Sequence, residues 1–264
     1  MSSIIRSSRT TPPSTTTPTR RRIYVGFSSN ELVPTIIAER SLYLHAALSR
    51  YSVHRVGRQM LRQHYTRPTS IVNDRLFDEI SQAPMSTDHA IARFFVPWLC
   101  DYQGWTLFTD GDILCRRAID DLFAHADDRY AVMCVQHPPL LGEGYKKDDQ
   151  VQIPYPRKNW SSVLLLNCGH PANRALSLDY LNRVPGRDLH AFNWLPDHEI
   201  GALPSEWNYL VGVSAVQPDP AIVHFTLGTP DLPDYAYSPF SDEWYAMAKR
   251  CGMRLSRPGV AVVS

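Results

Sequence analysis

The chain alternates short apolar runs with segments whose apolar residues recur at helical spacing. The apolar runs predict strands at residues 23–27, 53–56, 105–109, 130–135, 162–166, 213–216 and 221–225. The other segments predict helices at residues 34–50, 86–99, 118–124, 171–181 and 242–251. Pro97 should kink or shorten the second of these helices. Strands that alternate with helices predict an α/β/α sandwich around a mostly parallel sheet.

Three segments lack both patterns. Residues 57–87 mix Arg and Pro and predict a long functional loop or lid, and residues 141–150 read as a loop rich in Gly, Lys and Asp. Residues 1–22 are rich in Ser, Thr and Pro, end in three arginines and contain no acid. A targeting peptide can have that composition, but prolines disfavour an amphipathic helix. We therefore expect a disordered tail, followed by a single domain over residues 23–264.

The composition is that of an ordinary soluble globular protein. The 264 residues are 44% hydrophobic and 20% charged, with a formal net charge of +1. Near-neutral charge argues against a dedicated nucleic-acid binder. The sequence has no apolar run of about 18 residues, so no transmembrane helix is expected. The five cysteines are odd in number and scattered, which favours reduced thiols and a cytoplasmic location.

The most informative motif is Asp110-Gly111-Asp112, which directly follows the apolar run at residues 105–109. Two carboxylates at the rigid end of a strand can hold one hard divalent cation, whose open positions suit phosphate oxygens. Such triplets also arise by chance in solvated turns, but the setting at a strand end favours a metal site. Open α/β sheets bind ligands beyond the carboxyl ends of their strands. The turn at residues 27–30 should therefore face the same crevice.

Three residues elsewhere are candidates for this site. His224 ends an apolar run; it is either a buried core residue or, beside two carboxylates, a third ligand that suits manganese. Gly228 follows closely and would let the backbone approach a diphosphate. Arg93 lies on the helix before the metal strand. It is either a surface arginine or a bidentate donor to the phosphates or the sugar of a nucleotide-sugar.

Two polar residues are candidates for contact with a sugar. Asn167 follows the apolar run at residues 162–166 and can either cap the chain locally or hydrogen-bond sugar hydroxyls. Asp197 is explained either by a helix N-terminus or by a carboxylate beneath the anomeric carbon. In the second position it would stabilise the oxocarbenium-like state of glycosyl transfer.

Set in order along the chain, these motifs resemble those of the retaining glycosyltransferases of family 8, which have the GT-A fold, in a bacterial and phage-type branch. The resemblance covers about residues 23–250. It is carried by the Arg93 helix, the Asp110-Gly111-Asp112 motif, and the segments at residues 159–167, 203–208 and 223–228.

The resemblance implies a UDP-sugar donor and a Mn²⁺ or Mg²⁺ ion held by Asp110, Asp112 and His224. It further implies that the donor is contacted by Phe27, Ser28, Arg93, Gly111 and Gly228, and that its sugar is faced by Asn167 and Asp197.

The chain departs from the family pattern in three places. The family often has a lysine shortly after the glycine equivalent to Gly228, but here Thr229-Pro230-Asp231 follows. His198 stands where the family has glutamine. Ser161-Ser162 replaces a segment that often contains glycine.

We therefore predict a metal-dependent enzyme that transfers a hexose from a UDP-sugar to an acceptor hydroxyl, with retention at the anomeric carbon. The acceptor could be a glycan, a lipid-linked glycan, a protein or a modified DNA base. Two alternatives stay open. One is a phosphatase of the haloacid dehalogenase type, which also places two aspartates at a strand end. The other is an inactive module that binds a sugar nucleotide or a partner.

Overall fold

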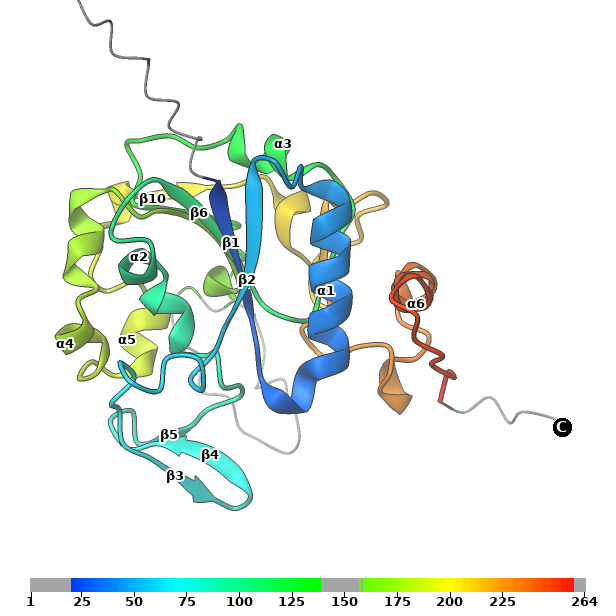
Figure 1. The fold of residues 1–264 in the computed structure, drawn as a ribbon, viewed down its shortest axis with the longest axis horizontal. Coiled ribbons are helices and arrows are strands. Elements are labelled where there is room, and N and C mark those ends of the chain that lie inside the picture. Colours follow the sequence, from blue (N-terminus) through cyan, green and yellow to red (C-terminus); the bar gives the residue numbers. More distant parts are fainter. Residues whose placement is uncertain (1–19, 139–156, 158, 259–264) are drawn as a thin grey trace, which may run out of the picture.

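The computed structural model describes residues 20–138, 157 and 159–258, and its centre is a six-stranded sheet (Figure 1). In spatial order the strands are β10 (Ile200–Ala202), β8 (Val132–Cys134), β9 (Val163–Asn167), β6 (Trp105–Thr109), β1 (Arg21–Gly26) and β2 (Tyr51–Val56). β9 runs antiparallel to both of its neighbours, and the other five strands are parallel to one another. The predicted mostly parallel sheet is confirmed.

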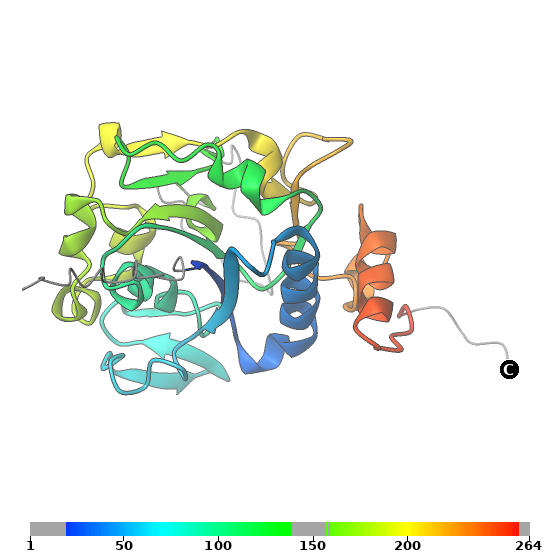
Figure 2. The same cartoon turned by 45° about the horizontal axis from the view of Figure 1, so that its top comes forward.

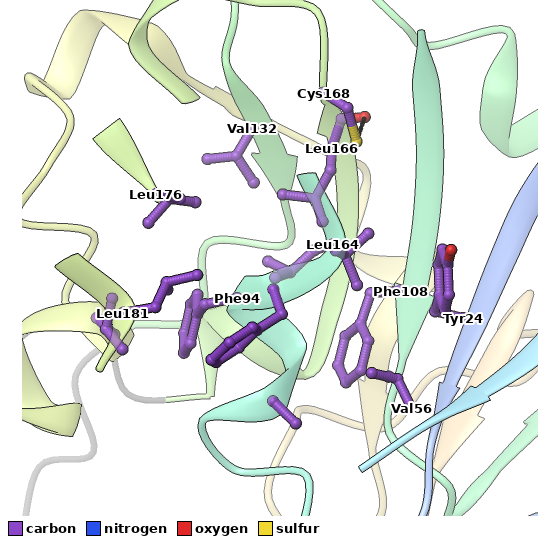
Figure 3. Packing of buried hydrophobic residues seen from close by; sticks show 14 of the residues in the cluster. Tyr24, Val56, Phe94, Phe108, Val132, Leu164, Leu166, Cys168, Leu176 and Leu181 are labelled. Carbon is purple, nitrogen blue, oxygen red and sulfur yellow. Dashed lines mark hydrogen bonds between the residues drawn. The ribbon is translucent and has the colours of Figure 1, made fainter. Parts of the chain in front are cut away.

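Both faces of the sheet are buried because side chains that alternate along each strand pack against different helices. On one face, Tyr24 and Phe108 pack with residues from the segments around α2 (Val96–Leu99), α4 (Leu178–Leu181) and α5 (Gly186–His190); Figure 3 shows part of this cluster. On the other face, Ile23 and Leu107 pack with α1 (Leu32–His45) and α3 (Ile119–Phe123). The alternation at β1 and β6 produces the predicted sandwich.

A second sheet places the Asp110–Asp112 turn next to His224. It contains β7 (Ile113–Cys115), β12 (Ile222–His224) and β11 (Tyr209–Leu210), with β12 in the middle. β7 and β12 are antiparallel, and His224 lies opposite Ile113. Because Ile113 directly follows Asp112, this register brings the histidine to the carboxylates. Helix α6 (Ser241–Arg250) packs against α1 on its outer side (Figure 2).

The segment at residues 57–87, predicted as a long loop or lid, contains strands, and its role as a lid stays a prediction. This segment contains a small antiparallel sheet, visible at the lower edge of Figure 1, made of β3 (Thr69–Val72), β4 (Arg75–Asp78) and β5 (Ala83–Pro84). Asn73 and Asp74 join β3 to β4 with φ of 50° and 58°. Two residues with positive φ form the turn that a tight hairpin favours, and Asn and Asp tolerate it.

Three predicted helices are shorter or broken. Helix α1 ends at His45 because Ala46 is extended, well before the predicted end at residue 50. The segment at residues 86–99 forms only a 3₁₀ turn, Ala92–Phe95, followed by α2, with Pro97 in the first turn of α2. The predicted helix at residues 171–181 is split into a 3₁₀ turn and α4. Ser177 separates the two parts and caps α4 by accepting a hydrogen bond from Tyr180 N.

Several strands also differ from the predictions, and β7 and β11 were not predicted. No strand forms at residues 213–216; there Val213 N and Ser214 N both turn back to Leu210 O, and β11 ends at Leu210 instead. Strand β10 was not predicted, because three residues with a central glycine carry almost no pattern. Of the remaining predictions, the loop at residues 141–150 and the tail up to residue 19 lie outside the described residues, and β1 begins at Arg21. In the described part of the chain, no helix combines the length and apolar character needed to cross a membrane.

Candidate functional site

Asp110, Asp112 and His224 form a cluster whose potential ligand atoms lie within 4.8 Å of one another. His224 Nε2 is 3.2 Å from Asp112 Oδ1 and 3.9 Å from Asp110 Oδ2. The Asp112 Oδ1 atom is buried, and no described residue satisfies it with a well-aligned hydrogen bond. A buried acceptor left in this state needs a partner. Two carboxylates and one imidazole suit a divalent metal ion such as Mn²⁺.

Asp110 is held in place by two residues from the segment before β6. His89 Nε2 lies 3.2 Å from Asp110 Oδ1, and Arg93 Nη2 lies 3.0 Å from the same atom. Arg93 also donates from Nε to Ala90 O at 3.1 Å and from Nη1 to Ser161 O at 2.7 Å. The arginine is buried, so it is not a surface residue. Its guanidinium is directed at Asp110 and at backbone carbonyls.

The charges in the cluster support one another. Burial by itself would raise the pKa of Asp110, but Arg93, with His89 and His224, outweighs it and holds that pKa far below its ordinary value. Burial would also raise the pKa of Asp112, but the charge of His224 outweighs burial, so this pKa is lowered. Burial would lower the pKa of His224, whereas Asp112 and then Asp110 raise it. Both carboxylates are therefore ionised at neutral pH.

Two glycines make this geometry possible. A Cβ atom on Gly111 would lie 2.4 Å from Gly26 O and 2.8 Å from Thr35 Oγ1, so only glycine lets the turn pack on the end of β1. A Cβ atom on Gly26 would lie 2.5 Å from Cδ2 of His89. The absence of a side chain at Gly26 therefore leaves space for the His89 ring to contact Asp110.

The remaining donor-site candidates lie just after β1 and just after β12. Ser28, directly after β1, accepts a hydrogen bond from Asp88 N at 2.8 Å, and its Oγ lies 3.4 Å from His89 Nδ1. Phe27 lies beneath the guanidinium of Arg55, 5.0 Å from ring centroid to Cζ. Gly228 donates its N–H to Phe225 O at 3.0 Å. A Cβ atom there would lie 2.2 Å from the ring of Tyr235, so this glycine makes room for an aromatic side chain.

The structure does not bring Asn167 to the cluster. Asn167 pairs with Trp105, whereas Asp110 follows Thr109 at the opposite end of β6. Four residue steps along a strand correspond to about 13 Å. The backbone carbonyl of Asn167 instead accepts from His170 N and from Asn173 Nδ2. Both bonds are made by the backbone, so local capping by the Asn167 side-chain amide stays a prediction. The sequence could not show that Asn167 lies at the opposite end of the sheet from Asp110, because this placement depends on β9 being antiparallel to β6.

Asp197 is not brought to the cluster either. It lies in the 3₁₀ turn Asp197–Glu199 before β10, the edge strand that β8 and β9 separate from β6. Its side chain is 92% exposed and forms an ion pair with Arg157. A solvent-exposed carboxylate on an edge strand is in no position to face a sugar bound at Asp110.

Two half-buried histidines that the sequence did not indicate lie near the site. His190, at the end of α5, has Nδ1 2.7 Å from Ser161 Oγ. Burial, followed by the charge of Arg93, lowers its pKa to about 3. His137 Nε2 lies 3.1 Å from Asn208 Nδ2. Burial, followed by His224, lowers its pKa to about 4. Isolated histidines belong to no sequence pattern, so only tertiary contacts identify them.

These two histidines predict a loss of stability in acid. Their pKa values are lowered on folding from about 6.5, so the unfolded chain binds more protons below that pH. The free energy of unfolding should fall as the pH drops from about 6.5 towards 4. Urea unfolding at pH 7, 6 and 5 measures the slope. His190→Gln should make it shallower, and the same change at the exposed His198 should not. An equal slope in all three proteins would contradict the assignment.

Comparison with known proteins identifies the fold. No family model matches the sequence. One curated relative, Protein CDI of Arabidopsis thaliana, is 46% identical over 164 residues, which are 60% of this chain and 63% of the relative. The chain thus matches less than two thirds of that relative's length.

Solved glycosyltransferases match by structure over 87% of the chain. The galactosyltransferase LgtC with donor and acceptor sugar analogs has a TM-score of 0.54 at 13% identity, with 95% of its chain covered. The bifunctional glycosyltransferase WbbM gives 0.54 at 15% identity, with 52% covered. GlyE of Streptococcus pneumoniae gives 0.52 at 16%, with 60% covered. At these identities the likeness shows the fold alone, and it confirms the predicted GT-A fold. Membership of family 8 and of a bacterial and phage-type branch stays a prediction.

Proposed function

We propose that this protein is a metal-dependent glycosyltransferase that moves a sugar from a UDP-sugar to an acceptor hydroxyl. One observation carries the proposal: in a chain with the GT-A fold, Asp110, Asp112 and His224 place three potential ligand atoms within 4.8 Å at the carboxyl end of β6. LgtC, with the same fold, was solved with donor and acceptor sugar analogs. This likeness favours a transferase over a phosphatase of the haloacid dehalogenase type.

Asp110, Asp112 and His224 would hold Mn²⁺ or Mg²⁺, which supplies a Lewis acid for the charge that develops on the leaving diphosphate. His89 and Arg93 keep the Asp110 carboxylate ionised and oriented before any ligand arrives. Preorganised charges of this kind need no rearrangement during the reaction.

The end of β1 and the turn after β12 supply the rest of the proposed donor site. Phe27 and Ser28 would contact the nucleotide, because Ser28 lies beside His89, which in turn contacts Asp110. The backbone at Gly111 and Gly228 would lie near the diphosphate. We keep Arg93 in the proposal as the residue that positions Asp110. Asn167 and Asp197 are left out because the structure places both away from the cluster.

Retention at the anomeric carbon is part of the proposal. Among the described residues, the two carboxylates of the cluster are both assigned as ligands. The acceptor proton is then taken by the departing phosphate oxygen on the same face of the sugar, so no separate base is required. We also propose a single catalytic domain over residues 23–264 and a cytoplasmic location. The acceptor would be a glycan, a lipid-linked glycan, a protein or a modified DNA base.

A panel of UDP-sugars tests the proposal. With Mn²⁺ present, one donor should release UDP faster than the others, because donor-site contacts also permit slow transfer to water. EDTA should stop the release, and added Mn²⁺ should restore it. UDP formation is measured for each donor with and without metal. UDP with Mn²⁺ should also raise the melting temperature. Binding without release from any donor would instead identify an inactive module. The absence of both binding and release would refute the proposal.

A further inference from the structure

A buried chain of hydrogen bonds leads from Ser162 through Asn208 to His224. Asn208 Nδ2 donates to Ser162 Oγ at 2.9 Å, and His224 Nδ1 lies 3.0 Å from Asn208 Oδ1. Exposure of the three residues is 5%, 0% and 2%. Ser162 belongs to the Ser161-Ser162 segment, where the sequence departs from the pattern of the glycosyltransferases it resembles.

The donors and acceptors along this chain can be assigned from the hydroxyl of Ser162. Ser162 Oγ donates its only proton to Asn159 O at 2.9 Å, so towards Asn208 it can only accept. The Asn208 atom that faces Ser162 is therefore the amide nitrogen. The same nitrogen lies 3.1 Å from His137 Nε2, which accepts its second proton. The Asn208 oxygen is left facing His224 Nδ1, and an amide oxygen only accepts. With this assignment, a neutral His224 carries its proton on Nδ1.

This proton position determines what His224 presents to the two aspartates. A neutral imidazole has one N–H, so a proton on Nδ1 leaves a lone pair on Nε2. Nε2 is the atom that lies 3.2 Å from Asp112 Oδ1. Without an acceptor at Nδ1, the two carboxylates would attract the proton to Nε2, which lies 3.2 Å from Asp112 Oδ1 and 3.9 Å from Asp110 Oδ2. That arrangement would block Nε2 as a metal ligand.

We propose that Ser162 and Asn208 are positioning residues that hold His224 in the tautomer able to bind a metal ion. The inference rests on the metal site of the proposed function. Ser162 acts at a second point as well, because its carbonyl accepts the N–H of Asp110 at 2.8 Å. One residue thus orients ligands from two strands that are far apart in the sequence. Partners of this kind are worth about 10–100-fold in metal affinity.

Mn²⁺ affinity of three variants tests the proposal by calorimetry on the full chain. Ser162→Ala removes the acceptor that fixes the Asn208 amide. The amide can then turn and offer a donor to Nδ1, which moves the imidazole proton to Nε2. Asn208→Leu removes the acceptor for Nδ1 directly. Both should weaken Mn²⁺ binding by about 10–100-fold. Asn208→Asp keeps an acceptor there and should retain most of the affinity. Ser214→Ala is the matched control, because the Ser214 hydroxyl accepts from Leu210 N at 3.1 Å and, among the described residues, forms no hydrogen bond with the cluster.

A spectroscopic measurement keeps the test decisive if a variant does not fold. Nitrogen-15 shifts of His224 in the metal-free wild-type protein, at a pH where the ring is neutral, report which nitrogen carries the proton. The proposal expects the proton on Nδ1. A proton on Nε2, or unchanged Mn²⁺ affinity in both Ser162→Ala and Asn208→Leu, overturns it. If the wild-type protein binds no Mn²⁺, the proposed function fails, and the nitrogen shifts still decide the tautomer.

Discussion

Replacing Asp112 with asparagine should reduce UDP release from the preferred donor by on the order of 10²–10³-fold, the loss typical when one preorganised group that stabilises developing charge is removed. Asp112 isolates the role of the metal better than Asp110 does. Asp110 also pairs with Arg93 and His89, and its removal would leave a buried guanidinium without its carboxylate. The contacts of Asp112 in the cluster are with His224 and the like charge of Asp110.

The measurement is steady-state UDP release together with Mn²⁺ affinity. The Asp112→Asn protein should fold, because asparagine has the same shape and the change relieves repulsion between two carboxylates. Asp179→Asn is the control, since Asp179 is exposed and pairs with Arg183 one helical turn away. Wild-type turnover in Asp112→Asn would show that the cluster does not carry the reaction. Equal losses in both variants would point to an effect of charge in general.

The largest expected loss of stability comes from Arg67→Met, at about 3–5 kcal/mol of unfolding free energy. The Arg67 and Asp78 side chains are 0% and 1% exposed. Arg67 donates to both Asp78 oxygens at 2.9 and 2.5 Å, and from Nη1 to Leu181 O and Val184 O, both at 2.7 Å. Methionine would leave a buried carboxylate and two carbonyls without their donor.

The position of this ion pair explains why its loss should be severe. Asp78 lies at the end of β4 and also accepts hydrogen bonds from Ser81 N and Oγ. Ser81 Oγ in turn accepts from Gly186 N at the start of α5. The pair therefore joins the small β3–β4–β5 sheet to the helix that carries His190.

Urea unfolding measures the effect. Arg183→Met removes an exposed ion pair with Asp179 and should cost no more than about 1 kcal/mol. Arg67→Met/Asp78→Leu removes the stranded charge and should recover part of the loss. A cost of about 1 kcal/mol or less in Arg67→Met would show that water reaches Asp78 and that the pair does not hold the two parts together.

The local hydrophobic pattern was sufficient to predict elements whose residues are all buried. The apolar run at residues 105–109 became β6 without a change of bounds. The length of the helix predicted at residues 86–99 was overestimated. Its apolar residues have helical spacing, but the segment forms only a 3₁₀ turn and the short helix α2, with Pro97 in the first turn of α2. The small β3–β4–β5 sheet was missed because its strands are half exposed, so their apolar positions do not alternate clearly.

The sequence by itself determined the α/β sandwich and the place of Asp110 and Asp112 at a strand end, because both follow from contiguous residues. Tertiary structure alone decided which distant residues join them. The register of β12 on β7 brought His224 in, and the antiparallel course of β9 sent Asn167 to the other end of the sheet while it placed Ser162 beside Asp110. Strand direction and register depend on packing between segments far apart in the chain, and no local pattern contains that information.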